Sequence, residues 1–186
     1  MIGDAPPQAV RHCLISLIGL PGVGKSTIGR RLARRLDFAF VDCDALIEQR
    51  SNMCIRDIFE TEGEQRFRDI ETALLEELTG ASATVIATGG GAVLRPGNRD
   101  LLRSRTHCVY LRSQPEALFR RLRHDRKRPL LQVADPEARL RELNEERDPL
   151  YRDAATCVLD TPGRSHQALV EAIVATLPLR VPEAAE

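Results

Sequence analysis

A chain of 186 residues with 42% hydrophobic side chains is long enough to bury one substantial core, and a second full domain would be crowded. Acidic and basic residues balance at 27 each, which disfavours a globally basic nucleic-acid binder. No apolar run approaches the ~18–20 residues that a membrane span needs, and "MIGDAPPQAV" lacks the basic start and apolar core of a secretion signal. We therefore expect one cytoplasmic domain that binds neither nucleic acid nor membrane.

Short apolar runs alternate with longer amphipathic segments along the chain. The runs expected to be strands are residues 12–18, 38–42, 83–88, 107–112 and 156–160. Between them, "STIGRRLARRL" and "RFRDIETALLEEL" place apolar residues on one helical face, and prolines predict helix starts within 95–98 and 114–122. Because strands that alternate with helices form parallel sheets, we predict an α/β fold: a three-layer parallel five-stranded sheet flanked by helices.

The domain is expected to span residues 12–178, with flexible tails at 1–11 and 179–186. Residues 123–135 are dense in charge and proline and lack periodicity, which is typical of a mobile loop. The five cysteines form an odd set without a CxxC pair, and four of them lie in apolar, strand-like runs. This pattern predicts buried, reduced thiols. The four histidines lack ligand spacing, so no zinc site is expected.

A phosphate-binding loop is predicted at "GLPGVGKST" (19–27), which matches G-x-x-x-x-G-K-[ST] between a predicted strand and a predicted helix. Gly19, Gly22 and Gly24 allow the backbone to curl so that its N–H groups face a β-phosphate. Lys25 would reach the β- and γ-phosphates, and the Ser26 hydroxyl would join the shell of a magnesium ion. The motif therefore predicts nucleotide binding.

A GTPase is the first alternative, because "DTPG" (160–163) imitates the D-x-x-G element of that class. However, this stretch follows the last predicted strand, and no N-K-x-D stretch for guanine is present. A simple turn built by proline and glycine, which borders the base, is the better interpretation.

Two aspartates in "FVDCDALIE", Asp42 and Asp44, are expected to end the second strand. Residues two apart on a strand share a face, so both carboxylates would point toward the phosphate site beyond the end of the strand. There they would act as a magnesium–water ligand and a base. A capping role stays open for Asp44, which precedes an expected helix.

Arg68, Arg128 and Arg147 lie in segments expected to face the same crevice. Arginine binds carboxylates and phosphates through two parallel hydrogen bonds, so this distribution suits an anionic acceptor as well as ATP. Composition alone does not separate these three from the solvated arginines of the surface.

Taken together, the motifs resemble the shikimate kinase family of P-loop kinases. The segments "GLPGVGKSTIGRRLA", "FVDCDALIE", "IRDIFETEGEQRFRDIE", "ATGGGAVL", "RPLL" and "RDPLYR" occur in the order and spacing of that family. The resemblance implies a P-loop kinase fold with a mobile lid at 123–135 and a substrate-binding helical region at 43–70. It also implies transfer of the ATP γ-phosphoryl group to the 3-hydroxyl of shikimate, giving shikimate 3-phosphate and ADP, in the pathway to chorismate and the aromatic amino acids.

By this resemblance, Asp44 would contact the shikimate hydroxyls and serve as the base. Arg68 and Arg147 would clamp the shikimate carboxylate, and Gly90, within Gly89–Gly91, would offer its backbone to the substrate. Three consecutive glycines would allow main chain to approach a small polyhydroxylated ring where any Cβ would collide. A bulge or tight turn is the alternative.

At the other end of the site, the resemblance implies that Asp42 holds Mg2+ through water, together with Ser26. Arg128 would come from the lid to the transferring phosphoryl group, and Arg164 would lie near the adenine. The catalytic set would be Lys25, Asp44 and Arg128, in a monomer. The residues expected to bind ATP are Gly22, Val23, Gly24, Lys25, Ser26, Thr27, Arg121, Arg128 and Arg164.

Two other functions stay open: a gluconate or nucleotide kinase of the same fold, and a regulator that keeps the fold as a ligand sensor. The arginine pair and "GGGAV" count against the first, and the presence of Lys25 and Asp44 counts against the second. One departure from the family pattern is Asn52, where a glycine is common. Asparagine tolerates the left-handed conformation, so the turn is expected to survive.

Overall fold

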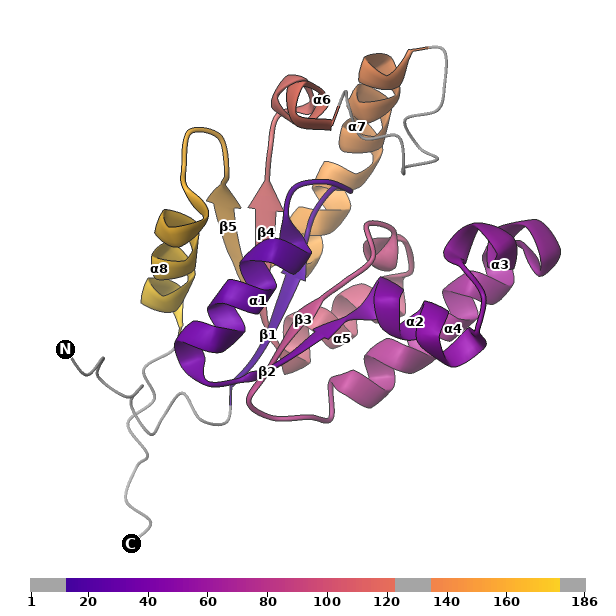
Figure 1. Ribbon diagram of the computed structural model, residues 1–186, viewed down its shortest axis with the longest axis horizontal. Helices are drawn as coiled ribbons and strands as arrows, with labels where there is room; N and C mark the ends of the chain where they lie inside the picture. Colours follow the sequence, from indigo (N-terminus) through magenta and orange to yellow (C-terminus); the bar gives the residue numbers. More distant parts are fainter. Residues whose placement is uncertain (1–12, 123–134, 178–186) are drawn as a thin grey trace, which may run out of the picture.

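The computed structural model describes residues 13–122 and 135–177, in which strands alternate with helices (Figure 1). The strands are β1 (Leu14–Ile18), β2 (Ala39–Asp42), β3 (Thr84–Ala87), β4 (His107–Arg112) and β5 (Cys157–Asp160). The helices are α1 (Lys25–Leu36), α2 (Cys43–Ser51), α3 (Ile55–Thr61), α4 (Gly63–Leu78), the short 3-10 helix η2 (Ala92–Leu94), α5 (Pro96–Arg105), α6 (Pro115–Leu122), α7 (Pro136–Ala154) and α8 (His166–Thr176). All the predicted strands are confirmed, with limits that differ by at most two residues.

The strands form one five-stranded parallel sheet in the order β2-β3-β1-β4-β5. Every residue of β1 and β3 is buried, as expected of strands that are covered on both faces. The predicted parallel α/β architecture is therefore confirmed. Because all the strands run in the same direction, their carboxyl ends meet along one edge of the sheet, and the loops that follow them gather there.

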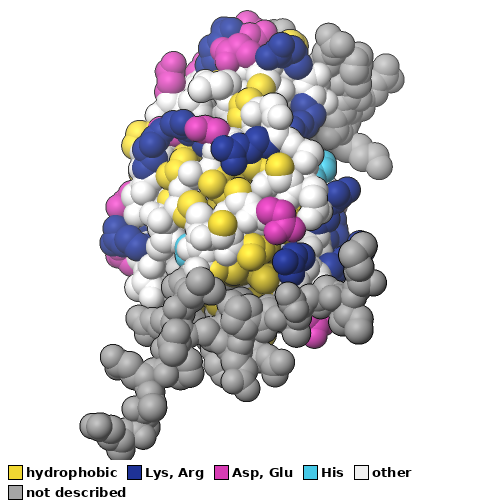
Figure 2. All heavy atoms as spheres, turned by 90° about the vertical axis from the view of Figure 1, so that its left-hand side faces the viewer, with side chains coloured by type: hydrophobic (Ala, Val, Ile, Leu, Met, Phe, Trp, Pro, Cys, Tyr) yellow, Lys and Arg dark blue, Asp and Glu magenta, His cyan; other side chains and the backbone are white. Residues whose placement is uncertain are grey.

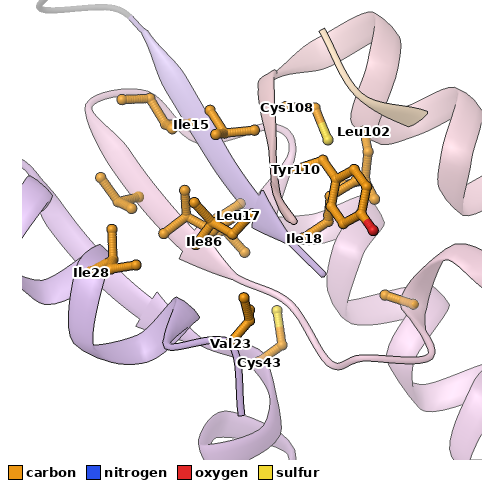
Figure 3. Packing of buried hydrophobic residues seen from close by; sticks show 14 of the residues in the cluster. Ile15, Leu17, Ile18, Val23, Ile28, Cys43, Ile86, Leu102, Cys108 and Tyr110 are labelled. Carbon is orange, nitrogen blue, oxygen red and sulfur yellow. The ribbon is translucent and has the colours of Figure 1, made fainter. Parts of the chain in front are cut away.

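Two helical layers cover the sheet. Helices α1 and α8 pack against each other on one face, and α4, α5 and α7 lie over the other (Figure 1). Side chains of β1 alternate between these layers: Leu17 lies toward Ile28 of α1, whereas Ile18 lies toward Leu102 of α5 (Figure 3). All four side chains are buried. This packing fixes α1 against the sheet, and with it the loop that precedes α1.

Several local predictions are confirmed at helix ends. Helices α5 and α6 begin at Pro96 and Pro115, where the missing N–H of proline removes no helical hydrogen bond. Helix α2 is followed by Asn52, which has φ 53° and ψ 30°. Asparagine therefore adopts the left-handed conformation that glycine usually provides at this point, and the turn survives.

All five cysteines are free thiols. Cys43 and Cys108 are buried, Cys13 and Cys157 are half-buried, and Cys54 is exposed. No helix within the described ranges is long and apolar enough to span a membrane. On the face that carries α8, acidic and basic side chains are interspersed (Figure 2), in keeping with the formal net charge of zero.

Candidate active site

The loop between β1 and α1 curls around the N-terminus of α1. Gly19, Gly22 and Gly24 have φ values of 139°, 86° and 104°, which residues with a Cβ rarely adopt. Gly24 is the N-cap of α1, and Ser26 and Thr27 lie in its first turn. The first N–H groups of a helix have no partner within it, and the helix dipole adds positive potential there. The local geometry is therefore that of a backbone cradle for phosphate.

Lys25 is the first residue of α1, and only 9% of it is exposed. Its Nζ donates hydrogen bonds to the carbonyl oxygens of Gly19 (2.7 Å) and Leu20 (3.1 Å). These bonds hold the ammonium group at the loop itself. A buried cation at a phosphate cradle is suited to stabilise negative charge on a bound triphosphate.

The arginines expected at the nucleotide come from three different segments. Arg121 lies on α6, and its Nη1 donates a hydrogen bond of 3.2 Å to the carbonyl oxygen of Val23, so that α6 is joined to the loop. Arg164 is exposed in the turn that follows β5. Arg128 and the predicted lid lie outside the described residues, apart from residue 135.

The expectation that Asp42 and Asp44 both end the second strand is wrong. Strand β2 stops at Asp42, and α2 already begins at Cys43. The Asp42 side chain accepts a hydrogen bond from the Ala45 N–H (3.4 Å) and is the N-cap, whereas Asp44 lies in the first turn of α2. The capping role considered for Asp44 therefore belongs to Asp42, because an N-cap side chain stands just before the first helical residue.

Asp44 is nevertheless electrostatically coupled to Lys25 at the phosphate loop and to Arg68 on α4. Burial raises the pKa of its carboxyl above the usual range; the charge of Lys25 opposes the rise, and the charges of Asp42 and Glu48 add to it. Arg68 also lowers this pKa. A carboxylate with a raised pKa, close to a lysine and an arginine, is a candidate for the group that accepts a proton.

Arg68 lies on α4 with 12% of its side chain exposed. Its Nη1 donates to Glu71 Oε2 (2.7 Å), and its Nε and Nη2 donate to Glu64 Oε1 (3.3 and 3.2 Å). The guanidinium also lies over the rings of Phe67 (5.1 Å) and Phe59 (5.9 Å). Glu71 and the rings fix Arg68 from the inside. The Glu64 side chain is 61% exposed, so a ligand carboxylate can replace this outer partner.

Glu71 is a site residue that the sequence analysis missed. It is 1% exposed, and its Oε1 has no hydrogen-bond partner among the described residues. Burial raises the pKa of this carboxyl, and Arg68 opposes the rise. A signal was present in the sequence: Glu71 falls on the apolar stripe of α4, four residues after Phe67 and three before Leu74, where a solvated acid is not expected.

The three glycines at 89–91 follow β3 at the same edge of the sheet, and none of them has a positive φ. A Cβ on Gly89 would lie 2.7 Å from Glu71 Oε1 and 2.8 Å from Asp44 Oδ1. A Cβ on Gly91 would lie 2.5 Å from Arg68 Nη1. The need for glycine is therefore steric. The sequence predicted that a substrate would approach the backbone here. In the structure, charged side chains of the protein itself also lie too close to this backbone for a Cβ.

Helix α7 brings Arg147 and Tyr151 to this turn. The Tyr151 hydroxyl donates to the Gly90 carbonyl oxygen (2.6 Å), and Arg147 Nη1 donates to the same oxygen (3.2 Å). The Arg147 side chain is 11% exposed, and its Nε is buried without a hydrogen-bond partner in the described part of the chain. The Glu146 carboxylate is 3.9 Å from this Nε, too far for a hydrogen bond. An unpaired buried donor is costly, which indicates that it serves a ligand.

Metal binding is limited by the number of protein ligands. No group of three or more His, Cys, Asp and Glu side chains within residues 13–122 and 135–177 can hold a metal ion. Ser26 in the first turn of α1 and Asp42 at the carboxyl end of β2 are nevertheless hard oxygen donors, which fit Mg2+ because this ion keeps several waters and binds substrate phosphates. The arrangement suits phosphoryl transfer from a nucleoside triphosphate to a small anionic acceptor.

Comparisons with known proteins point to one family. The family model "Shikimate kinase" matches residues 21–178. A shikimate kinase of Paracidovorax citrulli is 55% identical over 168 residues, which cover 89% of this chain and 92% of the relative. A shikimate kinase of Halorhodospira halophila is 50% identical over 163 residues, which cover 88% of this chain and 92% of the relative.

Solved structures agree with the sequence comparisons. The structure of a shikimate kinase from Acinetobacter baumannii in complex with shikimate superposes with a TM-score of 0.85 at 43% identity, and the match covers 91% of this chain and 95% of that one. A gluconokinase from Sinorhizobium meliloti gives a TM-score of 0.55 at 16% identity, over 90% of this chain and 92% of that one. The second likeness concerns the fold alone.

Proposed function

The chain belongs to the shikimate kinase family, and from this premise we propose how its residues transfer the γ-phosphoryl group of ATP to the 3-hydroxyl of shikimate. The products are shikimate 3-phosphate and ADP. The observation that carries the assignment of residues is the buried Nε of Arg147, which has no hydrogen-bond partner among the described residues and lies on α7 beside the glycine turn.

At the acceptor end, Arg147 and Arg68 bind the shikimate carboxylate. Arg147 offers its Nε, which donates no hydrogen bond within the described ranges, and Arg68 exchanges its bonds to the exposed Glu64 for bonds to the ligand. Arginine suits this task because its planar donors match the two oxygens of a carboxylate. The Glu71 Oε1, which accepts no hydrogen bond from any residue that the structure describes, supplies an acceptor for a hydroxyl of the same ligand.

At the phosphate end, the N–H groups of the loop 19–27 bind the β-phosphate, and Lys25 moves from its carbonyl partners to the β- and γ-phosphates. Arg121 lies beside the loop and adds positive charge there. Arg164 lies near the adenine in this assignment. These groups do little covalent chemistry; they hold the γ-phosphorus in line with the acceptor oxygen.

Asp44 lies between the two ends and orients the 3-hydroxyl. As the acceptor oxygen bonds to the γ-phosphorus, the bond from that phosphorus to the β–γ bridging oxygen breaks, and the Asp44 carboxylate takes the proton of the hydroxyl. Because the transition state of phosphoryl transfer is loose, orientation by Asp44 contributes more than early deprotonation.

A magnesium ion completes the site in this proposal. Ser26 would hold it directly and Asp42 through water, and the ion supplies charge neutralisation on the phosphates. Arg128, from the segment 123–135, would reach the transferring group and help to exclude water. We expect the enzyme to act as a monomer in the cytoplasm.

The test is ADP release from Mg-ATP in a coupled assay, with shikimate, quinate, gluconate and nucleoside monophosphates offered separately. Turnover with shikimate alone is expected. Quinate is the most demanding control, because it also carries a carboxylate and ring hydroxyls and would use the same arginines. Equal turnover with quinate or gluconate would contradict the proposed acceptor, and ATP binding without turnover on any of them would favour a sensor.

A further inference from the structure

The turn at residues 89–91 is anchored by its carbonyl groups. The Gly89 oxygen accepts a hydrogen bond from the Ala92 N–H (3.2 Å), and the Gly90 oxygen accepts from both Tyr151 and Arg147. The N–H groups of Gly90 and Gly91 donate no hydrogen bond to any described residue. The carbonyl oxygens of Gly89 and Gly90 are therefore occupied, whereas the N–H groups of Gly90 and Gly91 are available to a ligand.

The anchor of the Gly90 carbonyl also sets the direction of a donor. In a trans peptide the C=O of one residue and the N–H of the next point in opposite directions. Holding the Gly90 oxygen toward α7 thus aims the Gly91 N–H away from α7. Two adjacent glycines have no side chain to resist rotation of the peptide plane between them, so the anchor has to come from outside the turn.

Tyr151 is well suited to be that anchor. It is 1% exposed, and its ring stacks on Tyr110 with 4.9 Å between the centroids and 27° between the planes. The Tyr110 hydroxyl donates elsewhere, to Asp148 (2.9 Å), and is not needed for the stacking of the two rings. Burial raises the pKa of Tyr151 above its usual range, so the hydroxyl keeps its proton and remains a donor. Its bond to Gly90 is also shorter than that of Arg147, at 2.6 Å against 3.2 Å.

We propose that Tyr151 is a positioning residue for the acceptor: its hydroxyl holds the peptide between Gly90 and Gly91 so that the Gly91 N–H meets a hydroxyl of the acceptor. Arg147 does not fully replace it, because its Nη1 makes the longer bond to the Gly90 oxygen, and its guanidinium has to adjust when the Nε binds the acceptor carboxylate. The inference rests on the proposed function of this site. It adds a residue that touches neither substrate and acts through the backbone.

The test is Tyr151→Phe, which keeps the ring and removes only the hydroxyl. We expect the KM for shikimate to rise about three- to tenfold, as the loss of one hydrogen bond predicts. The KM for ATP should stay within about twofold, since the hydroxyl does not contact the phosphate loop. The Gly91 amide resonance, measured by 15N NMR, should shift and broaden in the free protein.

The matched control is Tyr110→Phe, which removes a hydroxyl from the stacked partner and leaves the bond to Gly90 in place. This variant should keep the shikimate KM of the wild type, whatever its melting temperature. An unchanged shikimate KM in Tyr151→Phe, an equal rise for ATP, or an equal rise in Tyr110→Phe would overturn the inference while the proposed function stands. Absence of shikimate-dependent turnover in the wild-type protein would overturn both.

Discussion

The phosphate end and the acceptor end of the proposed active site are built in different ways. The phosphate end comes from one continuous stretch, residues 19–27, and its main binding groups are backbone N–H donors at the start of α1. The acceptor end is collected from α2, α4, the turn after β3, and α7, and its binding groups are charged side chains. One end is a local structure, whereas the other exists only when four elements pack together.

This difference has an energetic side. The phosphate loop presents backbone N–H groups at the start of α1, where such groups have no partner within the helix and every helix start provides them. At the acceptor end Glu71 is buried and Asp44 is half-buried, both carboxyls have raised pKa values, and Glu71 Oε1 and Arg147 Nε have no hydrogen-bond partner in the described part of the chain. Buried groups of this kind reduce stability until a ligand pairs with them. Substitutions at the two ends should therefore differ in which ligand they affect and in how they change stability.

Lys25→Ala should give the largest effect and should break the phosphate end alone. Removing the ammonium from the transferring phosphates should lower kcat by about a hundred- to a thousandfold. Shikimate binding, measured by calorimetry, should stay within about twofold, because the carboxylate clamp is formed by Arg68 on α4 and Arg147 on α7. Arg34→Ala is a matched control, since it removes a cation from the exposed side of the same helix. Normal turnover in Lys25→Ala would contradict the role given to the loop.

Asp44→Asn should lower kcat by about a hundredfold, because the amide can accept a hydrogen bond but not a proton. The stability should change in the opposite direction. The folded-state pKa of Asp44 is raised, so ionisation disfavours folding above the unfolded-state pKa, and this cost disappears as the pH falls. The uncharged variant avoids the cost, so its melting temperature at neutral pH should equal or exceed that of the wild type.

A control for this variant is Asp57→Asn, on the exposed side of α3. It should change neither kcat nor the melting temperature beyond a small surface effect. A clear fall in the melting temperature of Asp44→Asn would show that the ionised carboxylate stabilises the fold, which would contradict the contrast drawn between the two ends.

Arg68→Ala should act on the acceptor end alone. The loss of a charge-assisted pair should raise the KM for shikimate about ten- to a hundredfold and leave the KM for ATP nearly unchanged. It should also lower the melting temperature, because Glu71 would lose its partner in the core. Arg66→Ala is a close control: Arg66 lies on the same helix, and its one ion pair within residues 13–122 and 135–177 is with the exposed Glu62. Equal losses for both substrates in Arg68→Ala would argue against a carboxylate clamp.

The same contrast explains why the phosphate end was easier to predict from the sequence than the acceptor end. The phosphate loop and the helix starts at Pro96 and Pro115 depend on residues that are adjacent in the chain, and their geometry agrees with the prediction. Asp42 and Asp44 were expected on one strand, but their relation depends on where β2 ends. That limit is set by capping of α2, and a two-residue period cannot show it.

Other features of the acceptor end needed the tertiary structure. The sequence pointed to a close approach at the three glycines, but it could not show that Glu71, Asp44 and Arg68 are the groups that approach them. Tyr151 gave no signal of its own, because a tyrosine near the end of an amphipathic helix is ordinarily a core residue. Its hydroxyl gains a role only because α7 passes beside a turn 61 residues earlier in the chain.

Glu48→Gln should give the smallest effect and should sharpen the electrostatic account of Asp44. The charge of Glu48 adds to the rise in the Asp44 pKa, so removing it should lower that pKa. If transfer requires ionised Asp44, the acid limb of the kcat/KM profile should move to lower pH, with little change on the plateau. The glutamine keeps the oxygen that accepts the Ile55 N–H, so the link between α2 and α3 survives.

The control is Glu76→Gln, at an exposed position of α4, which should leave the profile unchanged. A limb that moves to higher pH in Glu48→Gln, or that stays in place, would mean that a group other than Asp44 controls the acid side of the reaction.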